Sequence, residues 1–192
     1  PDSVESIGSA AFFSCAHLTG LTFGSGLKKL AEFAFADCAN LAGEVALPEG
    51  VTMIERRTFY LCFNLTGITL GDGVTSIGES AFFSCSKLSG AVVIPEGVTL
   101  IGDFTFDSCP RIGGLYFKGD APSVGLDALH NVTCAVFYVS GRSGWGTTFG
   151  GRPAEVWTST ATFDAGPGSV KPGALVYLVG QPYQALPTPV HE

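Results

Sequence analysis

The feature that most constrains this chain is a segment that recurs at a nearly constant interval. In each copy a Phe is followed three residues later by a Cys, and five copies lie within residues 1–118. The equivalent residues step by 23, 24, 23 and 24 along the chain; they are Phe12, Phe35, Phe59, Phe82 and Phe106, with Cys15, Cys38, Cys62, Cys85 and Cys109. A unit this short cannot bury its apolar residues alone, so the sequence predicts stacked copies that form a solenoid.

Every copy predicts the same local structure in the same order. A short alternating stretch, such as residues 21–23 or 68–70, indicates a strand, and the strands of successive coils would form one parallel sheet. A Gly or Pro turn follows, and then a second apolar pair such as Leu27 and Leu30. The segment around the Phe and the Cys is too short for a long helix, and we expect one or two helical turns there.

One pentapeptide, Ala-Phe-Phe-Ser-Cys, occurs twice in the chain, three coils apart. Its first Phe, which is Phe12 or Phe82, is expected to fill the core. Its second Phe, which is Phe13 or Phe83, is expected to face outward or half outward. The identity of the two copies therefore indicates a shared role in packing.

The full pattern, I-G-x-x-A-F-x-x-C-x-x-L-x-x-I-x-I-P-x-x-V, resembles the BspA-like (treponemal-type) leucine-rich repeat. The resemblance covers about residues 1–118, and Ala31 and Glu55 stand where the family has Gly. It implies a leucine-rich-repeat solenoid with a parallel β-sheet on the concave face and short helical turns or loops on the convex face. It also implies a surface protein that adheres to host matrix proteins or to other cells.

The period weakens after Phe117. Residues 119–158 predict a sixth, irregular coil and a cap, in which Trp145, Phe149 and Trp157 would cover the last coil. A cap is expected because an open solenoid end exposes core residues. The predicted solenoid domain is therefore 1–158.

Residues 159–192 resemble the first half of a Listeria–Bacteroides repeat, a small β-grasp-like module of bacterial surface proteins. The matching pieces include residues 162–165, 179–183 and 186–189. We expect these residues to form a short β tail. Because half of this module is present and the first repeat is incomplete, the sequence is expected to be a piece of a larger protein.

Composition and charge exclude several classes of partner. Of the 192 residues, 46% are hydrophobic and 14% are charged, which is enough for a packed core. The formal net charge is −7, and nucleic-acid binding needs a basic face. No apolar run approaches the ~18–20 residues of a spanning helix, so no direct membrane insertion is expected.

The cysteines predict a ladder of reduced thiols, with Cys134 as an irregular sixth rung. Neighbouring coils of such a solenoid lie about 4.8–5 Å apart. Parallel Cα–Cβ bonds would keep adjacent Cβ atoms near ~5 Å, which is longer than the ~3.8 Å that a disulfide prefers. The alternatives to a reduced ladder are a disulfide between some of these residues and a reactive thiol. Since the chain has no C-x-x-C pair, zinc is not predicted.

The three histidines, His17, His130 and His191, share no repeat position with one another or with a nucleophile. The sequence therefore predicts neither an enzyme nor a cofactor. An enzyme with a site in the cap, near His130, is the remote alternative.

The outward-facing position of each strand is the candidate binding site, because side chains alternate along a strand. The predicted row on the concave face consists of Thr22, Ala46, Thr69, Val93, Tyr116 and Phe137. The row is small and uncharged at first and aromatic later, and exposed Tyr and Phe commonly anchor protein partners. The alternative is that such residues simply suit strands.

A second row follows the strands and contains Ser25, Glu49, Asp72 and Glu96. The three carboxylates occupy the same position in adjacent coils, so they would line one edge of the solenoid that could bind a cation or a basic partner. The alternative is a set of solvated turn acids.

The residues themselves predict an extended sheet face without a catalytic constellation, and the family resemblance implies a non-catalytic binding module of a bacterial cell-surface protein, exposed outside the cell. Its expected partner is a host, matrix or cell-surface protein, with a glycan as the alternative. A structural spacer that displays another domain is the competing hypothesis.

Overall fold

The computed structural model describes residues 1–157. The chain divides into two compact units, Pro1–Thr158 and Ser159–Glu192. The second unit, with the β tail expected at 159–192 and His191, lies outside the described residues. Within residues 1–157 the regular elements are all strands, and the structure holds no helix there that could span a membrane.

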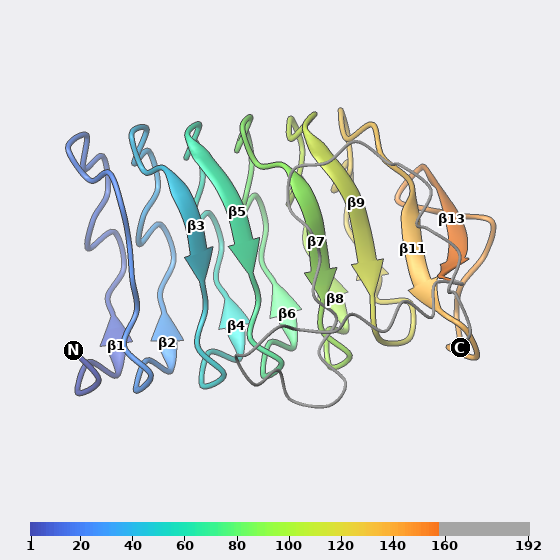
Figure 1. The fold of residues 1–192 in the computed structure, drawn as a ribbon, viewed down its shortest axis with the longest axis horizontal. Coiled ribbons are helices and arrows are strands. Elements are labelled where there is room, and N and C mark those ends of the chain that lie inside the picture. Colours follow the sequence, from blue (N-terminus) through green and yellow to red (C-terminus); the bar gives the residue numbers. More distant parts are fainter. Residues whose placement is uncertain (158–192) are drawn as a thin grey trace, which may run out of the picture. The chain divides into compact units, whose positions relative to one another are not determined.

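The first unit is a solenoid of stacked coils, whose longer strands form the front layer in Figure 1. These strands are β3 (Gly43–Ala46), β5 (Leu65–Thr69), β7 (Gly90–Ile94), β9 (Ile112–Phe117), β11 (Val136–Val139) and β13 (Arg152–Trp157). β3 pairs with β5, and β7, β9, β11 and β13 form a second parallel ladder. We call the outer surface of these strands the long-strand face. The predicted parallel pairing of successive coils is confirmed, although the long strands form two ladders where one sheet was expected.

A second sheet lies behind the first, which the sequence did not predict. It contains six two-residue strands, paired in parallel and in chain order: β1 (Ser6–Ile7), β2 (Lys29–Leu30), β4 (Met53–Ile54), β6 (Ser76–Ile77), β8 (Leu100–Ile101) and β10 (Ser123–Val124). The second residue of β2, β4, β6 and β8 is fully buried in the core, namely Leu30, Ile54, Ile77 and Ile101, whereas that of β10, Val124, is exposed. Strands this short show too little alternation to be recognised from sequence. Conversely, residues 21–23 form no strand.

The alternating repeat length has a structural cause in two of the longer strands. The register of β3 against β5 shifts between Gly43 and Glu44, and that of β7 against β9 shifts between Gly90 and Ala91. Gly43 and Gly90 have φ angles of +81° and +74°, a left-handed conformation that glycine adopts without steric cost. A β-bulge therefore absorbs the extra residue of the long copies and keeps the coils in phase.

The segment around each Phe and Cys forms a series of linked turns. The prediction of helical turns in this segment is therefore wrong. Two residues per coil, such as Ala10 and Ser14, have left-handed φ angles between 50° and 60°. Alternate N–H groups donate to the next coil, as from Phe12 to the Ala34 carbonyl at 2.8 Å. An α-helix would keep these bonds within one segment. We call this side of the solenoid the turn ridge.

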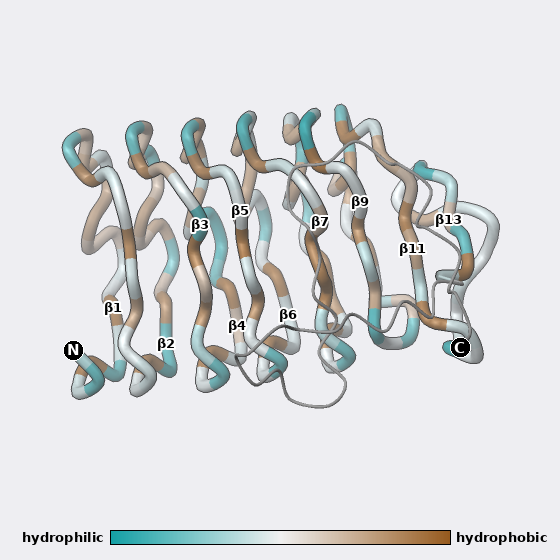
Figure 2. The backbone as a smooth tube through the Cα atoms, viewed as in Figure 1, coloured by the Kyte–Doolittle hydropathy of each residue, from teal (hydrophilic) through white to brown (hydrophobic). Residues whose placement is uncertain are grey.

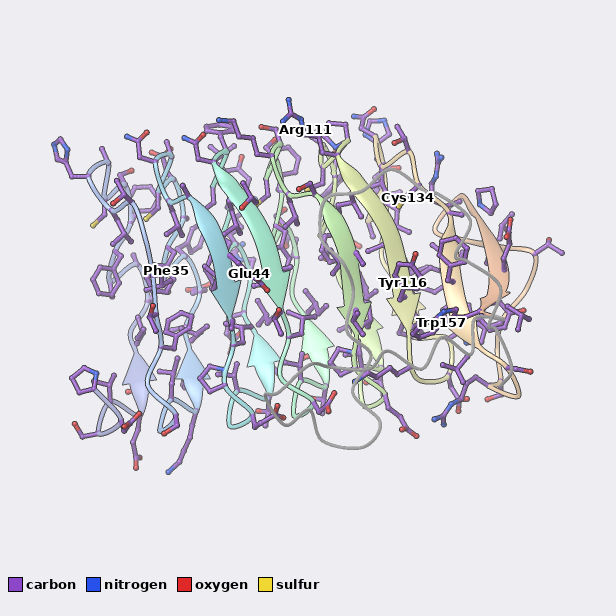
Figure 3. All side chains as sticks on the ribbon, viewed as in Figure 1. Phe35, Glu44, Arg111, Tyr116, Cys134 and Trp157 are labelled. Carbon is purple, nitrogen blue, oxygen red and sulfur yellow. The ribbon has the colours of Figure 1, made fainter. Side chains whose placement is uncertain are left out.

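The core contains a continuous stack of phenylalanine rings, one from each regular coil. Adjacent rings lie within 7° of parallel, and their centroids are 5.1–5.6 Å apart. Figure 3 labels Phe35, which packs between two of its equivalents. Leu129 takes the same place in the irregular coil and is almost fully buried. Figure 2 shows apolar residues recurring at equivalent places from coil to coil.

Coil 1 departs from the other coils in burial. Phe82 is fully buried as expected, whereas Phe12 is 39% exposed, because within the described residues coil 1 has a neighbour on one side only. The position after each Phe was expected to face outward, and Phe13 does, at 53% exposed. Phe83 is half-buried, which agrees with the expectation of a half-outward position, whereas the equivalents Ala36 and Asp107 are buried, so the expectation does not extend to every coil.

Replacing Phe82 by Ala should lower the free energy of unfolding by about 3–5 kcal/mol, the usual cost of a buried Phe cavity. Phe12→Ala should cost about half as much or less, because this ring is partly exposed and stacks on one side. Urea denaturation of both variants measures the difference. Equal losses would contradict the stacked-core description.

Candidate functional site

The structure places the predicted row on the long-strand face. Ala46 lies beside Thr69 in the register of β3 and β5, and Val93, Tyr116 and Phe137 are cross-strand neighbours on β7, β9 and β11. Thr22 is exposed but lies outside any strand, and β5 and β7 belong to separate ladders. The row therefore has two continuous parts. The first consists of Ala46 and Thr69, and the second, which contains the aromatic residues, consists of Val93, Tyr116 and Phe137.

The aromatic end of this face contains one residue that the sequence did not assign to it. Tyr116 and Phe137 stack with centroids 4.9 Å apart, and Trp157 of β13 meets Tyr116 edge to face at 5.4 Å. All three side chains are half-exposed. Figure 3 labels Tyr116 and Trp157 on the front sheet. We call Tyr116, Phe137 and Trp157 the aromatic patch.

The Tyr116 ring lies directly over a glycine. A Cβ atom added at Gly114 would meet the Tyr116 ring at 2.5–3.0 Å, so a side chain there would displace the ring. Gly114 is paired with Ala91 on β7. Small residues beside the patch therefore allow the ring to lie along the sheet, where it is held in place by Phe137.

Two of the three predicted cap residues cover the last coil, and the third does not. Trp145 stacks on Tyr138 at 4.7 Å and donates from Nε1 to the Gly119 carbonyl at 3.2 Å. Phe149, in β12 (Thr148–Phe149), packs against Phe117 at 5.1 Å. Trp157 lies on the aromatic patch instead. The alternation in residues 152–157, with the inward Ala154 buried, is the signal that could have placed it there.

The three carboxylates of the acidic edge have partners within the solenoid. Glu49 accepts a hydrogen bond from the Asp72 amide at 2.8 Å, so it satisfies a turn of the next coil. Asp72 pairs with Lys118 and Glu96 with Arg142, each at 2.8 Å. Among residues 1–157 no group of three or more His, Cys, Asp or Glu side chains is placed to hold a metal ion. The geometry therefore favours turn acids over a cation site.

The thiol ladder is confirmed in the four coils that follow the first. Each of these Cys donates from Sγ to the carbonyl of the Phe in the preceding coil at 3.0–3.2 Å; the thiols belong to Cys38, Cys62, Cys85 and Cys109. All six cysteines are free. Burial raises the pKa of these four thiols, and that of Cys109 to about 12. A buried, protonated thiol is a poor nucleophile, so the ladder is structural.

A polar cluster lies on the turn ridge between the fifth and sixth coils. The Asp107 carboxylate is near His130 Nδ1 at 3.1 Å and accepts from the Ser108 hydroxyl at 3.0 Å and from the Asn131 amide at 3.4 Å. In a catalytic triad the His lies between the Ser and the Asp. Here the Asp lies between the Ser and the His, so the cluster lacks a base aimed at a nucleophile.

The comparisons with known proteins agree with the repeat. The model of one protein family, described as the BspA type leucine rich repeat region, matches residues 1–113 in six copies. The match covers more than half of the chain, and the chain therefore belongs to the BspA-type leucine-rich repeat family. No curated protein matches it.

Several solved structures share the fold. The leucine-rich repeat protein TpLRR of T. pallidum is 24% identical, with a TM-score of 0.57 over 71% of each chain. A leucine-rich repeat protein of Bacteroides ovatus is 24% identical, with a TM-score of 0.53 over 73% of this chain and 50% of that one. The pneumococcal vaccine antigen PcpA is 20% identical, with a TM-score of 0.53 over 62% of this chain and 30% of that one. At these identities the likeness shows the fold alone.

The raised thiol pKa predicts a loss of stability in alkali. The folded pKa of Cys109, about 12, exceeds the ordinary value of 9.0, so its contribution is full below pH 9 and is lost as pH rises toward 12. Across this window one thiol changes the unfolding free energy by about 1.4 kcal/mol per pH unit. Cys109→Ala should make the stability–pH curve shallower by about that slope.

Urea denaturation between pH 8 and 11 in reducing buffer measures this slope. Val74→Ala is the matched control, because Val74 is fully buried but does not titrate, and its curve should run parallel to that of the parent protein. A Cys109→Ala curve that also runs parallel would contradict the protonated ladder.

Proposed function

We propose that this chain is a non-catalytic binding module displayed at a bacterial cell surface, and that it binds a protein partner through the aromatic patch of the long-strand face. The observation that carries this proposal is the cluster of three half-exposed aromatic side chains on adjacent strands. Aromatic residues dominate the energy of protein interfaces because they bury a large area with few rotatable bonds.

The surroundings of the patch also suit a partner surface. The rings are held against one another, so binding would cost little further side-chain entropy. Away from the patch the row continues with the short side chains of Ala46, Thr69 and Val93. Two exposed carboxylates also lie on this face, Glu44 on β3 and Glu155 beside Phe137 on β13. A partner could approach closely along the sheet and place its anchors at the aromatic end.

The location at a cell surface is supported by the relatives. PcpA, one of the structures with this fold, is a vaccine antigen, and such an antigen must be accessible to antibodies. Membership of the BspA-type family is consistent with a protein-binding role. Adhesion to host or matrix proteins is the form of binding that we propose for this chain.

The double variant Tyr116→Ser/Phe137→Ser should lose binding to purified extracellular-matrix proteins on an array. The expected loss is about 30-fold or more, because truncation of one interface anchor commonly costs about 2 kcal/mol. The array is first screened with the parent chain to find the bound protein, and its affinity for each variant is then measured by surface plasmon resonance.

A matched control comes from the turn ridge. Tyr60 and Phe83 form a second stacked pair, with centroids 5.1 Å apart, on a different side of the solenoid. Tyr60→Ser/Phe83→Ser should leave the affinity unchanged, provided that both double variants remain folded by circular dichroism. Equal affinity of the parent and the Tyr116/Phe137 variant would reject the aromatic patch and favour the spacer hypothesis.

A further inference from the structure

The three rings of the aromatic patch come together over the middle strand of three. β11 lies between β9 and β13 in the ladder, and Tyr116 and Phe137 are cross-strand neighbours on β9 and β11. Trp157 on β13 nevertheless meets the Tyr116 ring at 5.4 Å, so its indole reaches across β11 (Figure 3). Because the indole plane is inclined at 62° to the Tyr116 ring, the patch presents aromatic faces in two directions.

One carboxylate borders these rings. Glu155 is the cross-strand neighbour of Phe137, and it lies two residues before Trp157 on the same strand. Side chains two residues apart on a strand point to the same side, so Glu155 and Trp157 both stand on the long-strand face. Glu155 is exposed, and within residues 1–157 its carboxylate has no ion pair or hydrogen bond.

The cations on the neighbouring strands are engaged elsewhere. Lys118, directly after β9, pairs with Asp72 at 2.8 Å. Arg152, at the start of β13, donates to the carbonyl of Cys134 at 3.3 Å and to that of Thr133 at 3.0 Å. The charge of the carboxylate beside the rings is therefore not compensated by either of these side chains.

The turn ridge shows how the same groups are combined when a cation is present. There the stacked rings of Tyr60 and Phe83 have the Arg57 guanidinium 5.5 Å above the Tyr60 ring, and Arg57 pairs with Glu79 at 3.3 Å. A stacked aromatic pair, a guanidinium and a carboxylate thus form one cluster within the chain. At the aromatic patch the stacked pair and the carboxylate recur, but Glu155 has no such cation among residues 1–157.

We propose that the partner bound by the aromatic patch supplies this cation, as an Arg or Lys side chain that lies against the rings and pairs with Glu155. The inference rests on the proposed function, because it specifies the partner of the same site. Aromatic faces attract cations, and the attraction grows when water is excluded. A carboxylate beside them adds a countercharge within the interface. The patch therefore recognises a basic segment of a protein, with Glu155 as the residue that determines this preference.

Arginine suits the site better than lysine. Its planar guanidinium can stack on a ring and still offer two N–H groups to a carboxylate, whereas the lysine ammonium is a point charge. An acidic partner would be repelled by Glu155 and by the formal net charge of −7. A neutral glycan would gain nothing from the negative charge beside the rings. The charge at the patch thus separates these three classes of partner.

The test selects ligands from a random peptide library displayed on phage, with the full chain as the immobilised target. Peptides that bind the parent chain but not Tyr116→Ser/Phe137→Ser are the ligands of the patch. The same selection is made on Glu155→Gln, which removes the charge and keeps the shape of the side chain. Glu55→Gln is the matched control, because it changes the net charge equally and Glu55 follows β4 in the other sheet.

We expect ligands of the patch to contain Arg or Lys at least about threefold more often than the unselected library, and this enrichment should be lost on Glu155→Gln. Calorimetry of the tightest peptide then measures a double-mutant cycle. Glu155→Gln and replacement of the basic residue of the peptide by Gln should each weaken binding about tenfold. Both changes together should cost little more than one, because they remove the same interaction. Glu55→Gln should bind as the parent chain does.

Two results would overturn the inference and leave binding at the patch intact. One is a set of patch ligands without enrichment of Arg or Lys, and the other is a cycle in which the two losses simply add. If no selected peptide loses binding to Tyr116→Ser/Phe137→Ser, the patch itself is rejected as a binding site, and the inference is rejected with it.

Discussion

The structure depends on one constraint, which is that every coil stacks on the next at the spacing set by parallel backbone hydrogen bonds. At that spacing each side chain meets its own equivalent, so a residue suits the fold only if it packs well against a copy of itself. Phenylalanine does so by stacking, with ring centroids 5.1–5.6 Å apart. Cysteine does so because its thiol reaches the carbonyl of the preceding Phe, as from Cys62 to Phe35 at 3.2 Å.

The same constraint explains why the chemistry of the cysteines is suppressed. A regular row of thiols would suggest disulfides or a metal site in an extracellular protein. In this fold the thiols of four consecutive coils, Cys38, Cys62, Cys85 and Cys109, each donate to a carbonyl, and burial raises their pKa. The residues that recur most strictly along the sequence therefore contribute to stability, and the candidate binding site lies among the residues that change from coil to coil.

The aromatic patch depends on this arrangement too. Tyr116, Phe137 and Trp157 are far apart in the chain but lie on adjacent strands of one ladder, so their rings meet. The paired strands of the ladder hold the patch, and Gly114 leaves room for the Tyr116 ring. Cover at the C-terminal end of the described coils is a separate requirement, which Trp145 and Phe149 meet.

The sequence by itself determined the repeat, the number and phase of the regular coils, the buried Phe and Cys, and the outward row of the long strands. All of these follow from periodicity, because equivalent positions in a stack have equivalent surroundings. Only the tertiary structure decided three further features. The turn ridge is not helical, because its N–H groups bond to the next coil; Trp157 belongs to the patch, because β13 adds to the ladder; and Glu49 serves a turn of the next coil. Each depends on a partner a whole coil or more away along the chain, and no local pattern reports the geometry of that contact.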